Sequence, residues 1–361
     1  MFLKVDLVNN QKQWTIDDDI QDILVQCASI WNILDGKSIF ITGGTGFIGR
    51  WLLESIYQAN KTLKVDINVT VLTRSIDAFN LREPHLVSCK EFTFLLGDVI
   101  NFDGNISRKF DYMIHAATEA SASLNEENPK LMFQTIINGT QNMLDFSVEK
   151  SIGKVLFLSS GAIYGQQPWE MHHISENWNG SLDCCDPKNT YAEGKRAAEM
   201  ACSIYKKQFE VEISIARVFS LLGPYLPIDT HFAAGNFIRD SINGKTIVVN
   251  GNGLPERSFL YPTDMVVWLL HILVEKKGDI YNVGSDESIS IGKLAELVSH
   301  IIGSDGFEIR GKNDKGWNLG RYVPSIDKIS NNLCMKRKVT LTDAIFRTAL
   351  WNGWSDENEG I

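Results

Sequence analysis

The 361-residue sequence has no long apolar segment. Its longest mainly apolar run covers residues 265–274, far short of the roughly 20 residues that a membrane-spanning helix needs. The start, MFLKVDLVNN, does not resemble a signal peptide, because Asp6 interrupts any apolar stretch. We therefore expect a soluble, cytoplasmic protein without a membrane partner.

The sequence also lacks the patterns of several binding classes. Its six cysteines, at positions 27, 89, 184, 185, 202 and 334, have neither metal-ligand nor disulfide-framework spacing. A bond between the adjacent Cys184 and Cys185 would be strained. The formal net charge of −9 argues against a nucleic-acid partner. Internal repeats and low-complexity tracts are absent, so we expect a globular protein that binds no metal.

The segment from residue 37 to residue 160 alternates short β-branched runs with longer amphipathic stretches. Examples are SIFIT, RWLLESIYQA, INVTVLT and FTFLLGD. Such alternation is typical of strand–helix–strand crossover units, and it predicts an α/β fold with a doubly wound parallel sheet. The expected strands are almost continuously apolar, as in sheets that are covered by helices on both faces.

The chain divides into three expected parts. Residues 1–36 carry an acidic, amphipathic segment, for which we expect an N-terminal accessory helical extension that packs on the outside or on a partner subunit. Residues 37–220 contain the alternating pattern and form the expected larger domain, to which later strands near residues 255–285 return. From residue 221 to residue 361 the elements are shorter and turns are frequent, which indicates a smaller α/β domain that mainly binds the substrate.

The stretch IFITGGTGFIGRWLLESI, residues 39–56, has four glycines between an expected strand and an expected helix. Gly43, Gly46 and Gly49 have the spacing that allows a tight turn, close approach of the backbone to a pyrophosphate, and close helix-on-strand packing. The helix N-terminus supplies free N–H donors and a partial positive charge to phosphates. A sharp turn without a ligand is the alternative, but the strand before and the helix after favour a Rossmann-type dinucleotide site.

The next expected strand ends at VTVLTRS, with Thr73 followed by Arg74. A carboxylate there would hold the ribose 2′-hydroxyl of NAD, whereas an arginine accommodates the 2′-phosphate of NADP. Arg74 therefore favours NADP(H), with NAD(H) as the second choice and an ordinary surface arginine as the alternative. Asp98, at the end of FTFLLGD, either reaches the adenine or only forms a turn beside Gly97.

The segment YAEGK places Tyr191 and Lys195 on one face of an expected helix. Tyrosine has a reference pKa near 10, so its pKa must move by about three units, or about 4 kcal/mol, for proton exchange near neutral pH. The Lys195 ammonium group would favour the phenolate and supply part of that shift. Upstream, VLFLSS ends a strand with Ser159 and Ser160, whose hydroxyls could hydrogen-bond a substrate carbonyl or alcohol.

Together these residues resemble the extended branch of the short-chain dehydrogenase/reductase family, which contains nucleotide-sugar epimerases, dehydratases and reductases. The likeness runs from about residue 37 to about residue 352, and it implies that Ser160, Tyr191 and Lys195 are catalytic. The segments TGGTGFIG, GDV and IHAAT are similar to cofactor-binding segments, and NGTQNML is similar to the helix after the fourth strand. The implied NAD(P)-binding residues are Gly43, Gly46, Phe47, Ile48, Gly49, Thr73, Arg74, Ser75, Asp98, Val99, Ala116, Ala117, Thr118, Thr135, Ser159, Tyr191, Lys195 and Phe219.

The resemblance continues through NFIRDSINGKTIVVNGNGLPERSFLYPTDMV. In relatives an arginine of this segment meets the nucleotide diphosphate, whose charges need cationic partners. Where this chain has Ser220, relatives usually have an asparagine near the diphosphate, which leaves the substrate pose open. The implied substrate-binding residues are Ser160, Ser220, Asn236, Phe237, Arg257, Lys315 and Arg321, the last two as candidates for a second phosphate contact.

One departure from the family bears on the reaction. Sugar 4,6-dehydratases have Asp and Glu directly after the catalytic hydroxyl residue, and decarboxylases of this branch keep the Glu. This chain has Gly161 and Ala162 there, so elimination of water after C4 oxidation lacks its usual acid and base. His172 and His173 could substitute as acids, although solvent-exposed or packing roles are the favoured alternative.

We therefore expect an NADPH-dependent reductase of an NDP-4-keto-6-deoxyhexose, with hydride transfer to C4 and a proton from Tyr191, in deoxysugar or polysaccharide biosynthesis. An NDP-hexose 4-epimerase with tightly bound NAD(P) is the alternative. An NDP-sugar 4,6-dehydratase and a non-catalytic NADP-binding regulator are further alternatives. The expected partners are the nucleotide-diphospho-sugar substrate and, by analogy with the family, a second copy of the chain in a homodimer.

Overall fold

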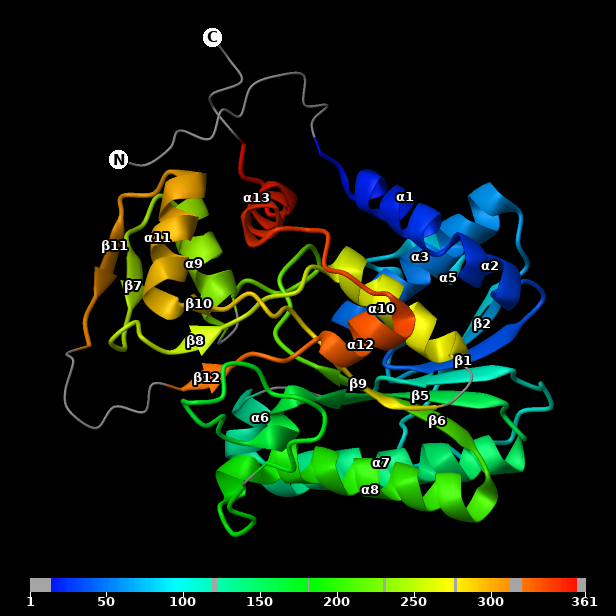
Figure 1. The fold of residues 1–361 in the computed structure, drawn as a ribbon. Helices are drawn as coiled ribbons and strands as arrows, with labels where there is room; N and C mark the ends of the chain where they lie inside the picture. The colour runs from blue at the N-terminus through cyan, green and yellow to red at the C-terminus, as the bar shows by residue number, and fades with distance from the viewer. Residues whose placement is uncertain are drawn as a thin grey trace.

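A computed structural model describes residues 14–118, 122–180, 182–229, 232–275, 278–311 and 320–355. At its centre is a seven-stranded sheet with the strand order β3-β2-β1-β4-β5-β6-β9, in which all neighbouring strands are parallel (Figure 1). The chain order reverses between β1 and β4, which is the switch point of a doubly wound sheet. The predicted fold class is therefore confirmed.

The strands are short, and most of their residues are buried. β5 is buried along its whole length, because helices cover both faces of the sheet. The strands of the large sheet are β1 (Ser38–Thr42), β2 (Asn68–Thr73), β3 (Phe92–Leu96), β4 (Tyr112–His115), β5 (Lys154–Ser160), β6 (Glu212–Val218) and β9 (Ile280–Val283).

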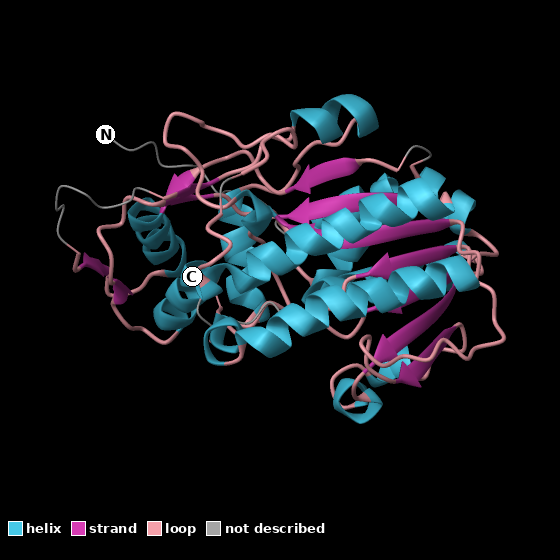
Figure 2. Cartoon of the chain, turned by 90° about the horizontal axis from the view of Figure 1, so that it is seen from below, coloured by secondary structure: helices cyan, strands magenta, loops and turns pink. Residues whose placement is uncertain are grey.

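Two layers of helices enclose the sheet. α7 (Pro129–Glu149) and α8 (Thr190–Phe209) lie side by side on one face (Figures 1 and 2). α3 (Phe47–Leu63) and α10 (Pro262–Val274) contact each other on the opposite face. Shorter helices complete this part of the chain: α4 (Ile76–Asn80), α5 (Pro84–Val87), α6 (Ala122–Glu127), η1 (Gly161–Tyr164), η2 (Pro187–Asn189) and α12 (Asp327–Leu333).

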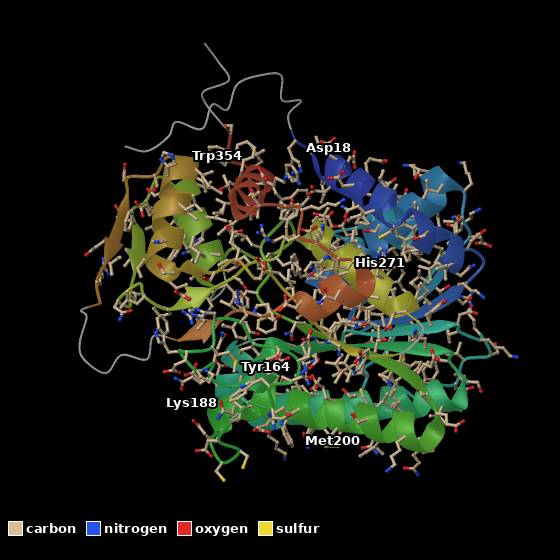
Figure 3. All side chains as sticks on the ribbon, in the orientation of Figure 1. Asp18, Tyr164, Lys188, Met200, His271 and Trp354 are labelled. Carbon is tan, nitrogen blue, oxygen red and sulfur yellow. The ribbon has the colours of Figure 1, made fainter. Side chains whose placement is uncertain are left out.

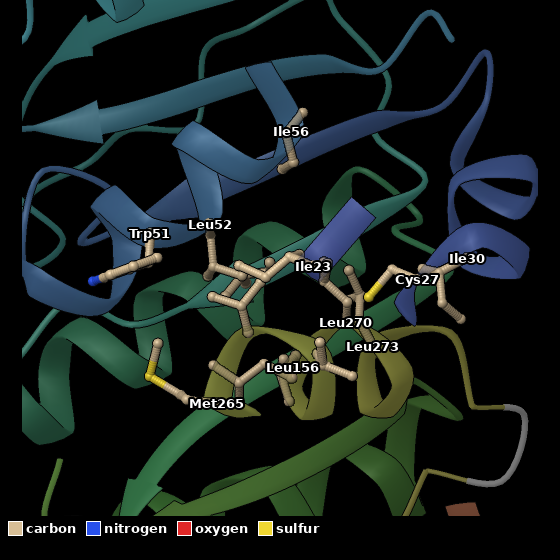
Figure 4. Packing of buried hydrophobic residues seen from close by; sticks show 14 of the residues in the cluster. Ile23, Cys27, Ile30, Trp51, Leu52, Ile56, Leu156, Met265, Leu270 and Leu273 are labelled. Atoms are coloured by element: carbon tan, nitrogen blue, oxygen red, sulfur yellow. The ribbon is translucent and has the colours of Figure 1, made fainter. Parts of the chain in front are cut away.

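The apolar run around residues 265–274 lies in α10 and is almost entirely buried. α10 lies between the sheet and two N-terminal helices, α1 (Ile16–Gln26) and α2 (Ala28–Leu34), so it is covered on more than one side. Figure 4 shows Ile23 and Cys27 packed beside Leu270 and Leu273. Within the described residues, we find no helix whose length and apolarity would let it span a bilayer.

The N-terminal helices pack on α10, α1 also contacts α3, and their inner faces contribute residues to the main hydrophobic core. Ile23, Cys27 and Trp31 are each at most 1% exposed. Asp19 of α1 accepts hydrogen bonds from Tyr261 Oη at 2.5 Å and from Arg347 Nη1 at 2.6 Å. The sequence pattern could not reveal this arrangement, because it depends on the apolar surface of α10.

The second part of the chain contains two small sheets, with strand orders β10-β8-β12 and β11-β7. We expected strands near residues 255–285 to return to the larger domain. β9 joins the large sheet and α10 packs on that sheet, whereas β8 joins a small sheet. Three helices pack together beside these strands. The elements are α9 (Ala233–Ile242), β7 (Ile247–Val249), β8 (Glu256–Arg257), β10 (Ile289–Ser290), α11 (Ile291–Ile302), β11 (Phe307–Ile309), β12 (Arg321–Tyr322) and α13 (Leu341–Trp351).

Candidate active site

A cleft of about 1420 Å³ runs past the carboxyl ends of the central strands to α9 and the small sheets. Every residue that the sequence implied for NAD(P) binding lines it. Five of the residues implied for substrate binding also line it: Ser160, Ser220, Asn236, Phe237 and Arg257. Lys315 lies outside the described residues. Parallel strands place all their carboxyl ends at one edge, which explains why residues distant in sequence meet here.

The glycine turn between β1 and α3 lines one end of the cleft. Gly43 has a φ of +71°, and a Cβ there would lie 2.6 Å from the Ala116 carbonyl carbon. A Cβ on Gly49 would lie 2.4 Å from the Gly43 carbonyl oxygen, so neither position admits a side chain. Gly46 precedes α3 without a side-chain cap, which leaves helix N–H groups available. This cradle fits a dinucleotide pyrophosphate.

The end of β2 offers hydroxyls and cations to the cleft. Thr73 Oγ1 lies 3.3 Å from Thr45 Oγ1, and Ser75 Oγ caps α4 by accepting from the Ala78 N–H at 3.2 Å. Arg74 lines the cleft, and so does Arg82, which the sequence analysis missed. Arg82 follows α4, and the Ser75 cap is the local sequence signal for that helix.

Asp98 forms the expected turn and lines the cleft. Its carboxylate accepts from the Ile100 N–H at 2.9 Å, which makes it a turn former. It also lines the cleft beside Val99. Its backbone position after β3 is consistent with an adenine contact.

Lys195 is buried at the centre of the cleft. Its ammonium group donates to Thr118 Oγ1 at 2.8 Å and to the Leu158 carbonyl at 2.8 Å. Burial lowers the pKa of Lys195 to about 7. Among the described residues, these two oxygens are its hydrogen-bond partners, so Lys195 is aimed along the strand ends towards Thr118.

The pKa of Tyr191 departs from the expectation in sign. Burial raises it, and the nearby Ser160 hydroxyl opposes the rise. The Tyr191 phenol therefore keeps its proton at neutral pH.

The two serines at the end of β5 have different roles. Ser159 Oγ donates to Glu199 Oε1 at 2.5 Å, and Glu199 also binds the Arg217 guanidinium at 2.7 Å. The Ser159 hydroxyl is thus used inside the protein, and Ser160 faces Tyr191. Glu199 was missed by the sequence analysis, although it follows Lys195 by one helical turn.

His115 fixes the strand end that carries Ala116, Ala117 and Thr118. Its ring nitrogens lie 2.7 Å from Thr42 Oγ1 and 3.1 Å from Thr140 Oγ1. Burial lowers the pKa of His115 to about 3, so the ring is neutral.

The space beside Gly161 is closed. A Cβ on Gly161 would lie 2.6 Å from Phe219 Cζ and 2.6 Å from Tyr322 Oη. The rings of Phe219 and Tyr322 pack with their centroids 4.6 Å apart. Tyr322 lines the cleft and was not among the predicted site residues, because its approach to Gly161 depends on how β12 is placed.

Cations line the other end of the cleft. Arg257 donates to the carbonyls of Glu256 and Gly320, and burial lowers its pKa. Arg239, which the sequence analysis missed, donates to Asn236 Oδ1 at 2.9 Å and also lines the cleft. The Arg257 guanidinium suits a diphosphate, whereas Arg239 is ion-paired with Asp240 at 2.8 Å.

Arg321 does not line the cleft. Its guanidinium donates to Glu256 Oε2 at 2.6 Å and to the Trp169 carbonyl at 2.7 Å, so it holds β12 in place. His172 and His173 also lie outside the cleft lining, and His173 Nε2 lies 3.0 Å from the Asp286 carbonyl oxygen. None of the three side chains is placed to act on a ligand in the cleft.

The fold and the cleft define the class of Rossmann-type nucleotide-binding enzymes. Residues 39–284 match the model of the NAD dependent epimerase/dehydratase family. The chain belongs to this family and is an enzyme, as the resemblance predicted.

Curated relatives act on nucleotide sugars according to their names. UDP-glucuronic acid decarboxylase 1 of Xenopus tropicalis is 30% identical over 316 residues, which cover 87% of this chain and 72% of the relative. UDP-glucuronic acid decarboxylase 6 of Arabidopsis thaliana is 30% identical, with 85% and 86% covered. These relatives are decarboxylases and not the 4-keto reductase that the sequence analysis expected.

Solved structures share the fold. A UDP-glucose 4-epimerase of Thermotoga maritima superposes with a TM-score of 0.75 at 20% identity, covering 87% of this chain and 98% of the epimerase. A dTDP-glucose 4,6-dehydratase of Streptomyces venezuelae, with NAD bound, gives a TM-score of 0.74 at 22% identity, covering 87% and 96%.

Proposed function

We propose that the chain reduces the C4 carbonyl of an NDP-4-keto-6-deoxyhexose with NADPH. The observation that carries this proposal is that Gly161 and Ala162, which follow Ser160, have no acidic side chain. Ala162 has only a methyl group where the dehydratases and decarboxylases of this family have glutamate. Gly161 cannot take a side chain, because Phe219 and Tyr322 fill the space where its Cβ would stand. The centre therefore supports redox chemistry at C4 without the acid and base that elimination of water uses.

In this proposal, Tyr191 and Ser160 provide the proton and a hydrogen bond for the reaction. The Tyr191 phenol gives its proton to the C4 oxygen, and Ser160 donates a hydrogen bond to the same oxygen. When bound, NADPH supplies the hydride that adds to C4. One hydride on carbon and one proton on oxygen convert the carbonyl to an alcohol, and Tyr191 regains its proton from solvent.

The cofactor preference is supported by charge at the adenosine end. Arg74 and Arg82 line the cleft, and the residues 72–75 that line it at the end of β2 include no carboxylate. Guanidinium groups suit a 2′-phosphate, whereas NAD is held there by a carboxylate. The glycine turn would hold the pyrophosphate, and Thr118 with Lys195 would hold a ribose. A solved relative contains NAD, so this preference is proposed for this chain alone.

The substrate class is supported by Arg257 and Arg239 at the far end of the cleft. Arg257 would contact the diphosphate of a nucleotide sugar, the substrate class that the names of the relatives also suggest, with Arg239 beside it in an ion pair with Asp240.

The homodimer is proposed from the outer faces of α7 and α8. Leu131, Phe133, Met200 and Ile204 are each more than 40% exposed there, and Figure 3 shows Met200 on the outer side of α8. A second copy would cover these apolar groups. Sedimentation velocity should give the mass of a dimer of this chain.

A 4-epimerase is the second candidate, because it also needs only C4 redox chemistry and would use the same acid-free centre. The test incubates the purified chain with NDP-hexoses and NDP-4-keto-6-deoxyhexoses, with and without NADPH. Stoichiometric loss of NADPH with the keto sugars supports the reductase. Interconversion of two NDP-hexoses without a net change in nicotinamide absorbance supports the epimerase and refutes the reductase.

A further inference from the structure

Tyr191, the proposed proton donor, lies in the first turn of α8, where a helix has backbone N–H groups without partners inside the helix. Such groups are commonly satisfied by the side chain of the N-cap residue, which is Asn189 here. The Asn189 side chain makes no capping hydrogen bond, and its Nδ2 donates instead to the Asp183 carbonyl at 3.0 Å. The next side chain, Thr190, donates to the Pro187 carbonyl at 2.6 Å. The start of α8 therefore needs a cap from another element.

This cap comes from α6. Asn125 Oδ1 accepts from the Tyr191 N–H at 3.0 Å, and Asn125 Nδ2 donates to the Lys188 carbonyl at 3.1 Å. Tyr191 is the second residue of α8, and its N–H is one of the two to which an N-cap oxygen normally binds. A single amide group of α6 therefore holds the turn η2 and the first turn of α8 together.

The segment that follows β4 thus contacts α8 at both predicted residues of the YAEGK stretch. Thr118 Oγ1 accepts from the Lys195 ammonium group at 2.8 Å, and Asn125 accepts from the Tyr191 backbone. Lys195 lies further inside the helix and has a second partner in the Leu158 carbonyl, whereas Tyr191 lies at the end, where helices fray. Asn125 does not line the cleft, so it can affect a bound ligand only through the residues that it holds.

We propose that Asn125 is a positioning residue, which caps α8 from α6 and thereby fixes the Tyr191 phenol for proton transfer. Proton transfer requires the phenol within hydrogen-bond reach of the C4 oxygen. Without the cap, the first turn of α8 opens more often, and the phenol spends less time in that geometry. This inference rests on the proposed C4 chemistry and adds a residue that acts through the backbone of Tyr191.

The kinetic test compares Asn125→Ala with Asn125→Asp in the full chain. Asn125→Ala removes the cap, and kcat should fall roughly 3- to 30-fold, which is the cost of a lost N-cap expressed as a rate. The Kd of NADPH should change less than about twofold, since Lys195 keeps its contacts with Thr118 and Leu158. Asn125→Asp keeps an oxygen for the Tyr191 N–H and should hold kcat within about threefold of wild type. An unchanged kcat in Asn125→Ala, or an equal loss in Asn125→Asp, would overturn the proposal.

Asn128→Ala is the matched control. Asn128 lies in the same segment and caps α7, because its side chain accepts from the Leu131 N–H at 3.1 Å. Its side chain does not line the cleft. This variant should lose a similar amount of stability in urea and keep its kcat. An equal kcat loss in Asn128→Ala would assign the effect of Asn125→Ala to a general loosening of the segment and overturn the positioning role.

A second readout does not depend on the reaction. In protein labelled with nitrogen-15 at tyrosine, NMR measures the hydrogen-exchange rate of each tyrosine amide without substrate. The rate at Tyr191 is divided by the rate at Tyr281, which is buried in β9, so that effects of overall stability are removed. Asn125→Ala should raise this ratio roughly 3- to 30-fold, and Asn128→Ala should leave it unchanged. An unchanged ratio in Asn125→Ala would refute the cap.

Failure of the proposed reaction and failure of the cap are distinguishable. If the wild-type chain does not oxidise NADPH with keto sugars, the proposed function fails. The kinetic comparison is then made with the C4 reaction that the wild type does catalyse. The exchange ratio at Tyr191 decides the cap in either case, because it is measured without turnover.

Discussion

The cation pair at the end of β2 gives the sharpest prediction about the cofactor. Arg74 and Arg82 both line the cleft there. A charge-assisted hydrogen bond to a phosphate contributes about 1.5 to 3 kcal/mol. Arg74→Ala should therefore weaken NADPH binding roughly 10- to 100-fold and leave NADH binding nearly unchanged. The effect of Arg82→Ala should be at the lower end of that range, because Arg82 Nε already donates to the Ala78 carbonyl at 3.3 Å.

The assay measures the Kd of NADPH and of NADH by fluorescence titration at low salt, where exposed charges are least screened. Arg310→Ala is the control. Arg310 pairs with the Glu308 carboxylate and does not line the cleft. It should change neither Kd. Equal losses for the two cofactors in Arg74→Ala, or tighter binding of NADH by the wild type, would refute the argument from charge.

Three further predictions concern the catalytic centre and the core. Tyr191→Phe should abolish turnover and leave NADPH binding nearly intact, since only the phenolic hydroxyl is lost; unchanged turnover would exclude Tyr191 as the proton donor. Burial lowers the pKa of Lys195 to about 7 in the folded protein, so the wild-type stability gains with rising pH between about 7 and about 10.5. We compare the free energies of unfolding of Lys195→Met and wild type in urea, without ligands, at about pH 7 and about pH 9. The variant should lose up to about 3 kcal/mol relative to wild type between the lower and the higher pH. A difference between the two proteins that does not change with pH would contradict this. Asp19→Ala should cost about 3 to 5 kcal/mol, because it leaves the Arg347 guanidinium without its buried carboxylate partner, and a loss below about 1 kcal/mol in the same urea assay would refute that role.

The parts of the site that the sequence predicted are those fixed by local chemistry. Gly43 and Gly49 are required where two backbone segments approach closely. The same short stretch of sequence predicts the strand before them and the helix after them. Tyr191 and Lys195 share a helix face, so their common position follows from helix geometry. The order of the parallel strands then brings these elements to one edge of the sheet.

The remaining features depend on contacts between distant segments. Arg321 binds Glu256 inside the small sheet, a pairing that no local pattern specifies. The hydrogen bonds of Lys195 to Thr118 and Leu158 decide where its charge points, and helix spacing alone cannot reveal them. Tyr322 reaches Gly161 only because β12 pairs with β8.

The most direct test of the proposed reaction follows the hydride itself. NADPH that carries deuterium on the transferred position of its nicotinamide ring is incubated with the purified chain and an NDP-4-keto-6-deoxyhexose. NMR and mass spectrometry of the product should show one deuterium on C4 for each NADPH consumed, with a new C4 hydroxyl. A C4 product without deuterium, or a 4-keto-6-deoxy product formed from NDP-glucose, would contradict the account.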